Sequence, residues 1–364
     1  MPTERSIEPY DAVLLVSFGG PEKPADVIPF LENVTRGRGI AAERLEEVGR
    51  HYDAFGGRSP INDQCRAFLA AVRADLADHG LAVPVYWGNR NWHPYLTETL
   101  AQMKADGVSR AAAFVTSAYA SYSGCRQYRE NLYDAVAGID DPPYLDKLRH
   151  YFNHPGFINA FADATCVALA QLPQTLQSGA RLVFVTHSIP SLMAESSGPT
   201  GGAYVAQHRT AADSIAQAVR DRTGVQHGHD LVYCSRSGPP QVPWLEPDVN
   251  NHLEKLAGDA LKAVVVIPVG FVSDHMEVVY DLDTEAKATA DRLGLVFQRA
   301  AAPGVHPGFV ATVRDLVLER AAVERGEFGR RSTVGAIGPT WDRCGRHCCP
   351  NPRKDRPALC EASS

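Results

Sequence analysis

The sequence predicts an α/β fold with two similar domains, each a doubly wound parallel sheet flanked by helices. Apolar runs typical of buried strands recur along the chain, and amphipathic segments follow them. Such alternation of strand and helix is typical of parallel sheets. A stretch with three prolines, residues 142–155, separates two series of similar size. We therefore expect domains at residues 1–155 and 156–307, followed by a helix and a cysteine-rich tail at residues 308–364.

The first series begins with Ala12–Ser17, a continuous apolar run of the kind expected for a strand buried on both faces. The helix expected at Glu43–Tyr52 ends before Gly56, Gly57 and Pro60, because glycine and proline do not continue a helix. The other expected strands are Val83–Trp87 and Arg110–Thr116, and the other expected helices are Pro24–Val34, Asp63–Asp78, Leu96–Asp106 and Gln127–Ala137.

The second series repeats this alternation after the proline-rich stretch. Its expected strands are Leu182–Thr186, Asp230–Cys234 and Ala263–Val269. Its expected helices are Gly156–Gln171, Gly202–Arg222, Val249–Ala257, an acidic helix that reaches Glu285, and Gly308–Glu324. No sequence repeat between the two series is obvious.

The composition is that of a soluble globular protein, with 45% apolar and 21% charged residues among 364. The net charge of −6 gives no general attraction to nucleic acid. No apolar run approaches the roughly 20 residues of a membrane span, and the first residues lack a secretory signal pattern. We expect a cytoplasmic protein without an integral membrane segment.

An acidic line follows the apolar run Val264–Val269 and the turn at Gly270. Glu277, Asp281 and Glu285 are spaced at i, i+4 and i+8, so on a helix they form one row. Neighbouring carboxylates repel one another, and such a row is tolerated on a wet surface or where cations or protons pass. Because sites lie at the carboxyl ends of strands in open α/β sheets, both a metal or proton-transfer site and a solvated helix face stay open.

His187 ends the buried run of the segment VFVTHSIP. A histidine in this place is either a metal ligand or base facing a cleft, or a buried structural residue. No GxSxG motif supports a hydrolase triad. No phosphate-binding GxxxxGK[ST] or GxGxxG motif supports a nucleotide enzyme.

Half of the eight cysteines lie close together near the end of the sequence: Cys344, Cys348, Cys349 and Cys360. In a reducing cytoplasm this pattern favours metal or iron–sulfur ligation over disulfides. The surrounding tail is too polar to form its own core, so a cluster would hold it in place.

Five ordered motifs together resemble one family. The motifs are SFGGP at residues 17–21, HYDAFGGRSPI at 51–61, THSIP at 186–190, PWLEPDV at 243–249 and PVGFVSDHMEVVYDLDTE at 268–285. These segments resemble the ferrochelatases, and the resemblance covers about residues 11–325. It implies the chelatase fold, with two Rossmann-like domains and a porphyrin cleft between them.

The resemblance implies an enzyme of heme biosynthesis, a lyase that inserts Fe²⁺, its substrate, into a porphyrin. It places His187 and Glu277 facing each other across the cleft, as the groups that bind Fe²⁺ and accept the pyrrole protons. Asp281 and Glu285 would continue as a relay for metal or protons.

For the porphyrin, the resemblance implies contacts with Tyr52 and Tyr128. Phe18 stands where some relatives carry a tyrosine that approaches the iron, so this chain lacks that axial oxygen. Expected neighbours of the propionates are Arg36, Ser59 and Ser121.

The loop TRGRGI at residues 35–40 carries no apolar lip of the kind found in membrane-bound relatives. A basic polar loop suits the four propionates of coproporphyrin III, so the chain is similar to the soluble bacterial branch that uses this substrate. Alternatives are a protoporphyrin IX ferrochelatase, a cobalt or nickel chelatase, or a non-catalytic heme-binding protein. We expect a monomer with transient contacts to upstream and downstream enzymes of the heme pathway.

Some ferrochelatases hold a [2Fe–2S] cluster with tail cysteines and one internal cysteine, and such clusters take four thiolates. By this resemblance the expected ligands are Cys166, Cys344, Cys349 and Cys360. Cys349 is favoured over Cys348 because it directly precedes the segment PNP. A zinc site and exposed free thiols are the alternatives.

Overall fold

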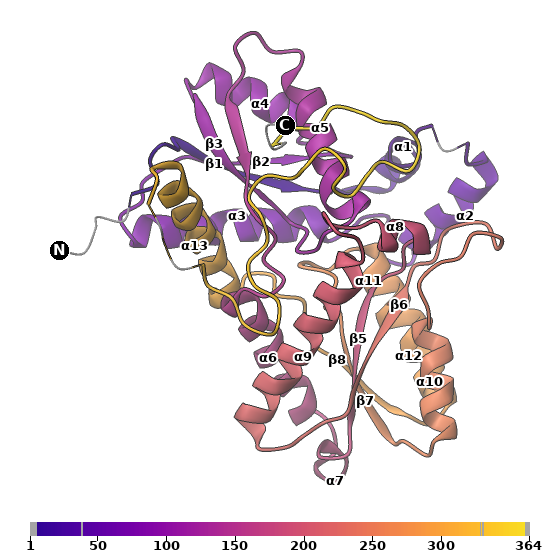
Figure 1. Ribbon diagram of the computed structural model, residues 1–364. Helices are drawn as coiled ribbons and strands as arrows, with labels where there is room; N and C mark the ends of the chain where they lie inside the picture. Colours follow the sequence, from indigo (N-terminus) through magenta and orange to yellow (C-terminus); the bar gives the residue numbers. More distant parts are fainter. Residues whose placement is uncertain (1–5, 38, 328, 330, 361–364) are drawn as a thin grey trace.

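The computed structural model describes residues 6–37, 39–327, 329 and 331–360. Two parallel four-stranded sheets organise the chain (Figure 1). The first has the order β2-β1-β3-β4 and the second β6-β5-β7-β8, so both halves repeat one topology. This confirms the predicted α/β fold of two similar halves. The strands are β1 (Ala12–Ser17), β2 (Val85–Asn89), β3 (Arg110–Val115), β4 (Tyr144–Lys147), β5 (Arg181–His187), β6 (His229–Cys234), β7 (Ala263–Ile267) and β8 (Val296–Arg299).

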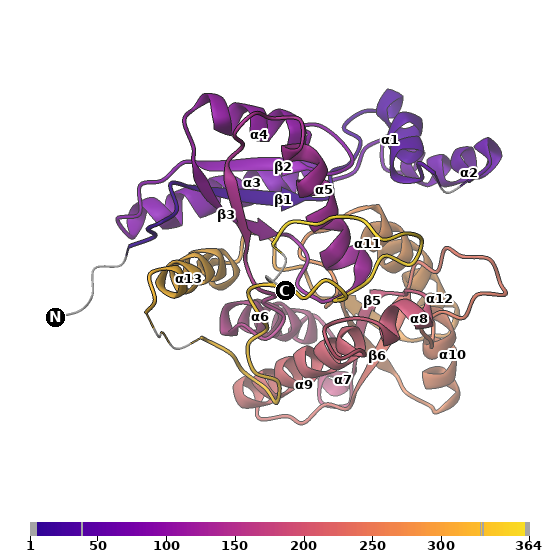
Figure 2. The ribbon, with the colours of Figure 1, turned by 45° about the horizontal axis from the view of Figure 1, so that its top comes forward.

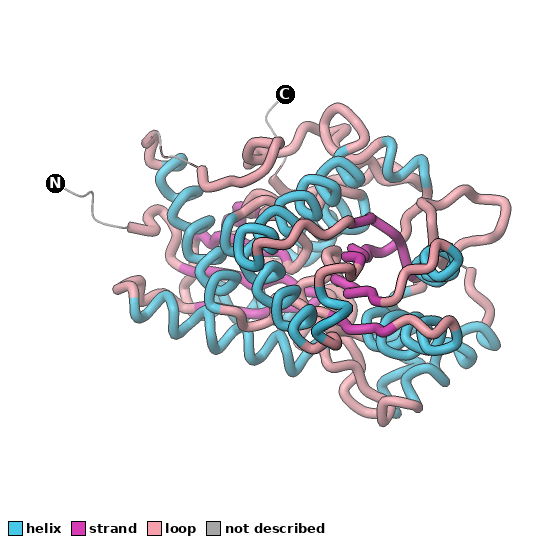
Figure 3. Tube along the Cα trace, turned by 90° about the horizontal axis from the view of Figure 1, so that it is seen from below, coloured by secondary structure: helices cyan, strands magenta, loops and turns pink. Residues whose placement is uncertain are grey.

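Helices cover both faces of each sheet, and the tube view shows the strands enclosed by them (Figure 3). In the first half they are α1 (Val27–Val34), which follows a 3₁₀ turn at Pro24–Asp26, α2 (Ala42–Asp53), α3 (Ile61–Asp78), α4 (Leu96–Ala105) and α5 (Gln127–Val136). In the second half they are α6 (Pro155–Ala170), α7 (Gln174–Gln177), α8 (Ser191–Glu195), α9 (Ala203–Thr223), α10 (Val249–Gly258), α11 (Met276–Tyr280), α12 (Lys287–Arg292) and α13 (Pro307–Glu324). Among the helices of the described chain, none combines the length and the apolar character needed to cross a bilayer.

Alternation along β1 sets the layers. Val13 and Leu15 pack toward α3, α6 and α13, whereas Leu14 packs toward α4 and α5. The inner faces of both sheets contribute to one continuous core with α3, α6, α9 and α13. Two apolar clusters fill the outer faces under α4 and α5 and under α10 and α12.

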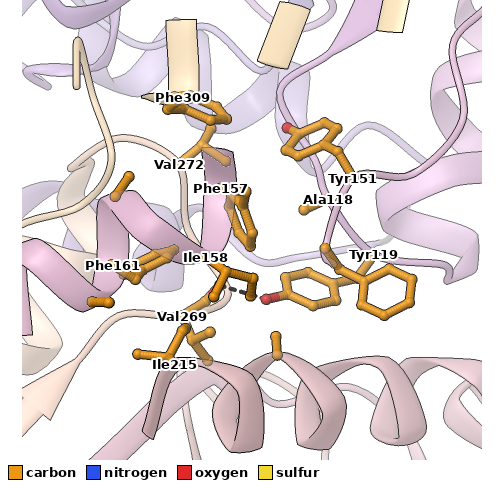
Figure 4. Close-up of a cluster of buried hydrophobic side chains, with 14 of the residues drawn as sticks. Ala118, Tyr119, Tyr151, Phe157, Ile158, Phe161, Ile215, Val269, Val272 and Phe309 are labelled. Atoms are coloured by element: carbon orange, nitrogen blue, oxygen red, sulfur yellow. Dashed lines mark hydrogen bonds between the residues drawn. The ribbon is translucent and has the colours of Figure 1, made fainter. Parts of the chain in front are cut away.

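Tyr119 joins the two halves within this shared core. Its hydroxyl donates to the carbonyl oxygen of Val269 at 2.9 Å, and the ring lies near Phe157 (Figure 4). Phe309 of α13 stacks on Phe68 of α3, with ring centroids 5.1 Å apart. Because α13 packs on both α3 and α6, the last helix belongs to the core of the whole chain. The boundaries at residues 155 and 307 stay a prediction.

The structure adds three features that the sequence reading lacked. The short strands β4 and β8, which were not among the expected strands, form one edge of each sheet. The acidic helix is interrupted: α11 continues as a π-helical turn, Asp281–Ala286, and then as α12. A second π turn, Tyr122–Arg126, precedes α5.

The tail after α13 runs back across both halves (Figure 2). Near its start, the amide of Val334 donates to the carbonyl oxygen of Asn153 at 2.9 Å. Near its end, Arg126 donates to the carbonyl oxygens of Arg346 at 2.8 Å and Arg356 at 2.7 Å. The tail is therefore fixed by backbone and side-chain hydrogen bonds to elements far away in the sequence.

Candidate functional site

His187 and Glu277 meet at the carboxyl ends of two neighbouring strands. His187 is the last residue of β5, and Glu277 lies in the first turn of α11, which follows β7. Since β5 and β7 pair in parallel, their ends open at the same edge of the sheet. His187 Nε2 lies 3.5 Å from Glu277 Oε1.

This distance changes the expected geometry of the pair. Two groups that touch opposite faces of a flat ring are about 7 Å apart, because each non-bonded contact takes about 3.5 Å. His187 and Glu277 are in direct contact instead. This direct contact leaves no room for a flat ring between the two side chains, so a ring bound here would meet both from one side.

The imidazole of His187 is oriented by its own loop. Nδ1 forms a short hydrogen bond with the carbonyl oxygen of Ser188, which turns Nε2 toward Glu277. Burial lowers the pKa of His187, but the charge of Glu277 and the hydrogen bonds to Glu277 and Ser188 raise it to about 9. With its pKa above 7, His187 carries a proton toward Glu277 at neutral pH, and any cation that bound Nε2 would displace that proton.

The acidic line leads from this pair toward solvent. Asp281 begins the π turn and is half-buried, whereas Glu285 is exposed. Burial raises the pKa of Asp281 to about 7, although a hydrogen bond from Ser235 opposes this shift. Within the acidic line, Asp281 can therefore exchange protons near neutral pH, and Glu285 beyond it is in free contact with water.

His275 supports Glu277 from the start of the helix. It is the N-cap of α11, and its Nδ1 accepts a hydrogen bond from the Glu277 amide at 3.2 Å. Its Nε2 lies 4.0 Å from Glu277 Oε2. We assign His275 to holding the first turn of α11 and thereby the carboxylate of Glu277.

An aromatic cluster brings Phe18 and Tyr52 close to the same helix. Phe30 of α1 lies edge-on to both rings, with centroids 6.3 Å from Phe18 and 6.5 Å from Tyr52. The cluster includes Met276 of α11. Burial, and then the charge of Glu277, raise the pKa of Tyr52. The α1–α2 segment therefore packs against α11. The predicted contact residues Phe18 and Tyr52 belong to this packed cluster.

Arg90 is a site residue that the sequence reading missed. Its guanidinium lies over the ring of Tyr128 at 4.7 Å and over that of Phe18 at 5.5 Å. No carboxylate of the described chain forms an ion pair with it. A signal was present, since Arg90 directly follows β2 at the carboxyl edge of the first sheet, but a single arginine after a strand is not distinctive. A cation between two expected contact residues suits an anionic ligand.

The three residues predicted to neighbour the propionates do not share the position of Arg90 between Phe18 and Tyr128. Arg36 is exposed just after α1. Ser121 is buried and caps the π turn, where its hydroxyl accepts from the Gly124 amide at 2.9 Å. Ser59 is buried as well, with its hydroxyl 3.4 Å from the Ile61 amide. Both serine hydroxyls thus contact backbone amides of their own loops.

Four cysteines gather where the tail passes the β3–α5 connection: Cys125, Cys344, Cys348 and Cys349. The sulfur atoms of Cys348 and Cys349 are 4.0 Å apart. Hydrogen bonds from Cys125 and Cys348 lower the pKa of Cys344. The indole of Trp341 donates to Cys344 Sγ at 3.0 Å, and the Gly198 amide donates to Cys349 Sγ at 3.1 Å. N–H donors aimed at sulfur stabilise thiolates.

Two of the predicted cluster ligands lie outside this group. Cys166 of α6 packs at the margin of the shared core, and the charged groups that act on its thiol are Arg222 and Asp163. Cys360 Sγ accepts a hydrogen bond from the Lys147 amide at 3.1 Å. Cys125 and Cys348 stand with the other sulfurs instead. Within the described residues, no three His, Cys, Asp or Glu side chains are arranged to hold a single metal ion.

Comparisons with known proteins agree with these motifs. The ferrochelatase family model matches residues 10–321. A coproporphyrin III ferrochelatase of Streptomyces coelicolor is 58% identical over 373 residues, covering 100% of this chain and 99% of that protein. One of Leifsonia xyli is 47% identical, covering 94% of this chain and 92% of that protein. The solved structure of SirB from Bacillus subtilis with Fe³⁺ has a TM-score of 0.53 at 13% identity, covering 87% of this chain and 98% of that one, and so shares the fold. The chain belongs to the ferrochelatase family.

Proposed function

We propose that this protein is an enzyme, a lyase that inserts Fe²⁺ into coproporphyrin III to give Fe-coproporphyrin in heme biosynthesis. The observation that carries this proposal is the contact of His187 with Glu277 at the carboxyl ends of β5 and β7. Relatives with coverage above nine-tenths of both chains are named for this activity.

In the proposed mechanism, Fe²⁺ binds His187 Nε2 and a carboxylate oxygen of Glu277 on one side of the macrocycle. Binding displaces the proton from His187. The two pyrrole protons leave as iron enters: when iron passes from the pair to the ring, Nε2 of His187 accepts one proton and the carboxylate of Glu277 accepts the other. Asp281, whose pKa of about 7 matches neutral pH, passes protons on to the exposed Glu285.

The substrate preference follows from charge. Coproporphyrin III carries four propionates, and Arg90 offers a cation at the expected contact residues Phe18 and Tyr128, while Arg36 offers an exposed one after α1. Arg90 is the stronger candidate because it is half-buried, where screening by water is weaker than for exposed Arg36.

Insertion assays with purified protein test the proposal. We expect a Soret shift when coproporphyrin III and Fe²⁺ are supplied anaerobically, and slower conversion of protoporphyrin IX. Co²⁺ and Ni²⁺ in place of Fe²⁺ test the alternative chelatases. His187→Ala and Glu277→Gln should abolish insertion while porphyrin binding, followed by fluorescence quenching, is kept. Porphyrin binding without insertion by the wild-type protein would establish a heme-binding protein instead.

We further propose that a [2Fe–2S] cluster is held by Cys125, Cys344, Cys348 and Cys349. This ligand set replaces Cys166 and Cys360 of the sequence prediction. The support is that four buried sulfurs from two distant segments converge, with N–H donors aimed at two of them. Bound there, a cluster would supply a one-electron redox centre and a covalent link between the tail and the loop before α5.

Absorption spectra of matched variants test this set. Cys125→Ser should remove the visible absorption of the purified protein and its acid-labile sulfide, whereas Cys166→Ser should keep both. If only Cys166→Ser loses its colour, the ligands are those predicted from the sequence, with Cys166 in place of Cys125. If the purified protein is colourless and contains stoichiometric zinc, the four cysteines hold zinc and not a cluster. A cytoplasmic location, a monomeric state and transient contacts with neighbouring enzymes of the pathway stay predictions.

A further inference from the structure

Ser235 has a backbone conformation that glycine normally takes. Its φ is +61°, and it directly follows Cys234, the last residue of β6. The other non-glycine residues with positive φ in the described chain are Asp141, Ala260, Cys349 and Cys360. Left-handed conformations are costly for residues with a Cβ and persist where the surroundings hold them, often at functional sites.

The position of Ser235 is set by the sheet. β6 pairs with β5, and Cys234 stands opposite His187 in their register. Ser235 therefore leaves the sheet beside the catalytic histidine. From this place its hydroxyl reaches across to Asp281, the first residue of the π turn, and donates a short hydrogen bond to Oδ2.

Counting hydrogens fixes the direction of this bond. The Ser235 hydroxyl has one hydrogen and two neighbours, Asp281 Oδ2 and Cys234 Sγ, the latter at 3.4 Å. An ionised carboxylate only accepts, and it is the stronger acceptor. The hydrogen of Ser235 therefore goes to Asp281, and the buried Cys234 thiol can donate to Ser235 in turn.

We propose that Ser235 is a positioning residue for Asp281, whose carboxylate it fixes between Glu277 and Glu285 so that iron reaches the His187–Glu277 pair along the acidic line. This inference rests on the proposed function and adds to it: besides passing protons, the carboxylate of Asp281 would hold iron on its way to the His187–Glu277 pair. The helix alone does not fix this carboxylate, because the π turn begins at Asp281 and changes the helical spacing there. The hydroxyl from β6 supplies the missing constraint.

Substitution by glycine separates the hydroxyl from the backbone. Glycine adopts a φ of +61° without strain, so Ser235→Gly removes only the donor and should leave the thermal stability unchanged or raised. Ala260 has the same φ of +61° next to α10. Ala260→Gly therefore relieves the same conformation outside the acidic line and is the matched control.

Steady-state kinetics with the full-length enzyme test the inference. We expect kcat/KM for Fe²⁺ to fall about ten-fold in Ser235→Gly, because a hydrogen bond to a charged group is lost, while KM for coproporphyrin III stays unchanged. Ala260→Gly should behave as the wild type. Ser235→Asn, which tolerates positive φ and keeps a donor, should recover most of the loss. Adding Ser235→Gly to Asp281→Asn should cause no further loss, because Ser235 acts through Asp281.

Three outcomes would overturn the inference, and they are distinguishable. If Asp281→Asn is impaired but Ser235→Gly is not, the acidic line serves iron and Ser235 does not position it. If Asp281→Asn itself inserts iron at the wild-type rate, the relay proposed for Asp281 fails, and the role of Ser235 fails with it. Equal losses in kcat/KM for iron and for porphyrin would indicate a general structural defect and would also reject the positioning role.

Discussion

At the scale of single residues, the contact between His187 and Glu277 would couple iron binding to proton release in the proposed mechanism. The pKa of about 9 at His187 means that the empty site carries a proton at neutral pH. Fe²⁺ and this proton compete for the same nitrogen, Nε2. In the proposed mechanism the carboxylate that raises the pKa is also the second ligand, so exchanging a proton for Fe²⁺ raises the local charge by one and not by two.

This competition predicts a pH dependence of iron binding. Below pH 9 each unit of rising pH should tighten the apparent Kd for Fe²⁺ about ten-fold, because one proton is displaced. Above that value the slope should vanish, because His187 is already neutral. Anaerobic calorimetry in two buffers of different ionisation enthalpy would count the released proton between pH 6.5 and 8. Glu277→Gln should release less, since the group that raises the pKa is gone.

Arg90 gives a second prediction at this scale. Arg90→Met keeps much of the packing on Phe18 and Tyr128 but removes the charge. We expect coproporphyrin III to bind about ten-fold more weakly, in line with the loss of a charged hydrogen bond, and the preference over protoporphyrin IX to shrink. Fluorescence titration measures both. The control is Arg292→Gln, an exposed arginine paired with Glu254 at 2.8 Å. Unchanged affinity in Arg90→Met would place the propionates elsewhere.

The sequence located the residues that long motifs carry and missed those that only folding brings together. His187, Glu277 and Asp281 follow buried strands in extended motifs, so their place at the sheet edge was predictable. Cys125 and Arg90 are single residues in short connections, with no periodicity to mark them. Cys166 was preferred as the internal cysteine because it lies on a clear helix, but spacing along the chain does not show which loop meets the tail.

At the scale of elements, two helices share one way of starting. α6 begins with His154, Pro155, Gly156 and Phe157, and α13 repeats the same four residue types from His306 to Phe309. In each, the imidazole Nδ1 of the N-cap histidine accepts a hydrogen bond from the glycine amide, at 3.2 Å in α6 and 3.1 Å in α13. This repeat of four residues is too short to stand out in 364, but it marks corresponding helices, α6 after β4 of the first sheet and α13 after β8 of the second.

The two helix starts cross at their glycines. A Cβ on Gly156 would lie 2.1 Å from the carbonyl oxygen of Gly308, whereas a Cβ on Gly308 would lie 3.2 Å from that of Gly156. Gly156→Ala should therefore lower the melting temperature by several degrees, since overpacking typically costs about 1–3 kcal/mol, and Gly308→Ala should have a smaller effect. Gly179→Ala, whose nearest atom is 4.0 Å away, is the control for calorimetry. Equal melting temperatures would contradict this close crossing.

The elements that the sequence misjudged have a physical reason in common. β4 and β8 have only four residues each and lie at sheet edges, so they carry little of the apolar signal that marks central strands. The π turn within the acidic helix begins at Asp281, which accepts a hydrogen bond from Ser235, 46 positions earlier in the sequence. Neither Ser235 nor Asp281 shows in the sequence that the regular helical spacing is interrupted there.

At the scale of the whole molecule, a charged network ties β4, α13 and the tail together. Asp146 is buried and pairs with Arg320 of α13 at 2.8 Å and with Arg110 of β3. Arg320 also approaches Asp342 of the tail at 3.5 Å. Burial raises the pKa of Asp146, but hydrogen bonds from the two arginines outweigh it and keep the pKa below its ordinary value.

Asp146→Asn should destabilise the protein by about 1.5–3 kcal/mol, because it removes a charged carboxylate that Arg320 and Arg110 share and leaves them only Glu324 and Asp342. Urea unfolding measures the free energy of unfolding. The contribution of this carboxylate is present above its unfolded pKa and is lost as the pH falls through the lowered folded value. Asp141→Asn, which breaks an exposed pair with Lys104, should have no measurable effect. Equal midpoints for the two variants would reject the role of the network.

The position of the cysteine group has a consequence for the order of biogenesis. Cys125 belongs to the first half of the chain, and contacts around it reach partners 220 and 230 positions away in the sequence. Domains fold in the order in which the ribosome makes them. Cys125 is therefore made well before the tail cysteines, but the inner face of the first sheet is completed only when α6 and α13 pack on it. Any iron–sulfur assembly at this place would be a step of late maturation, after both sheets have formed.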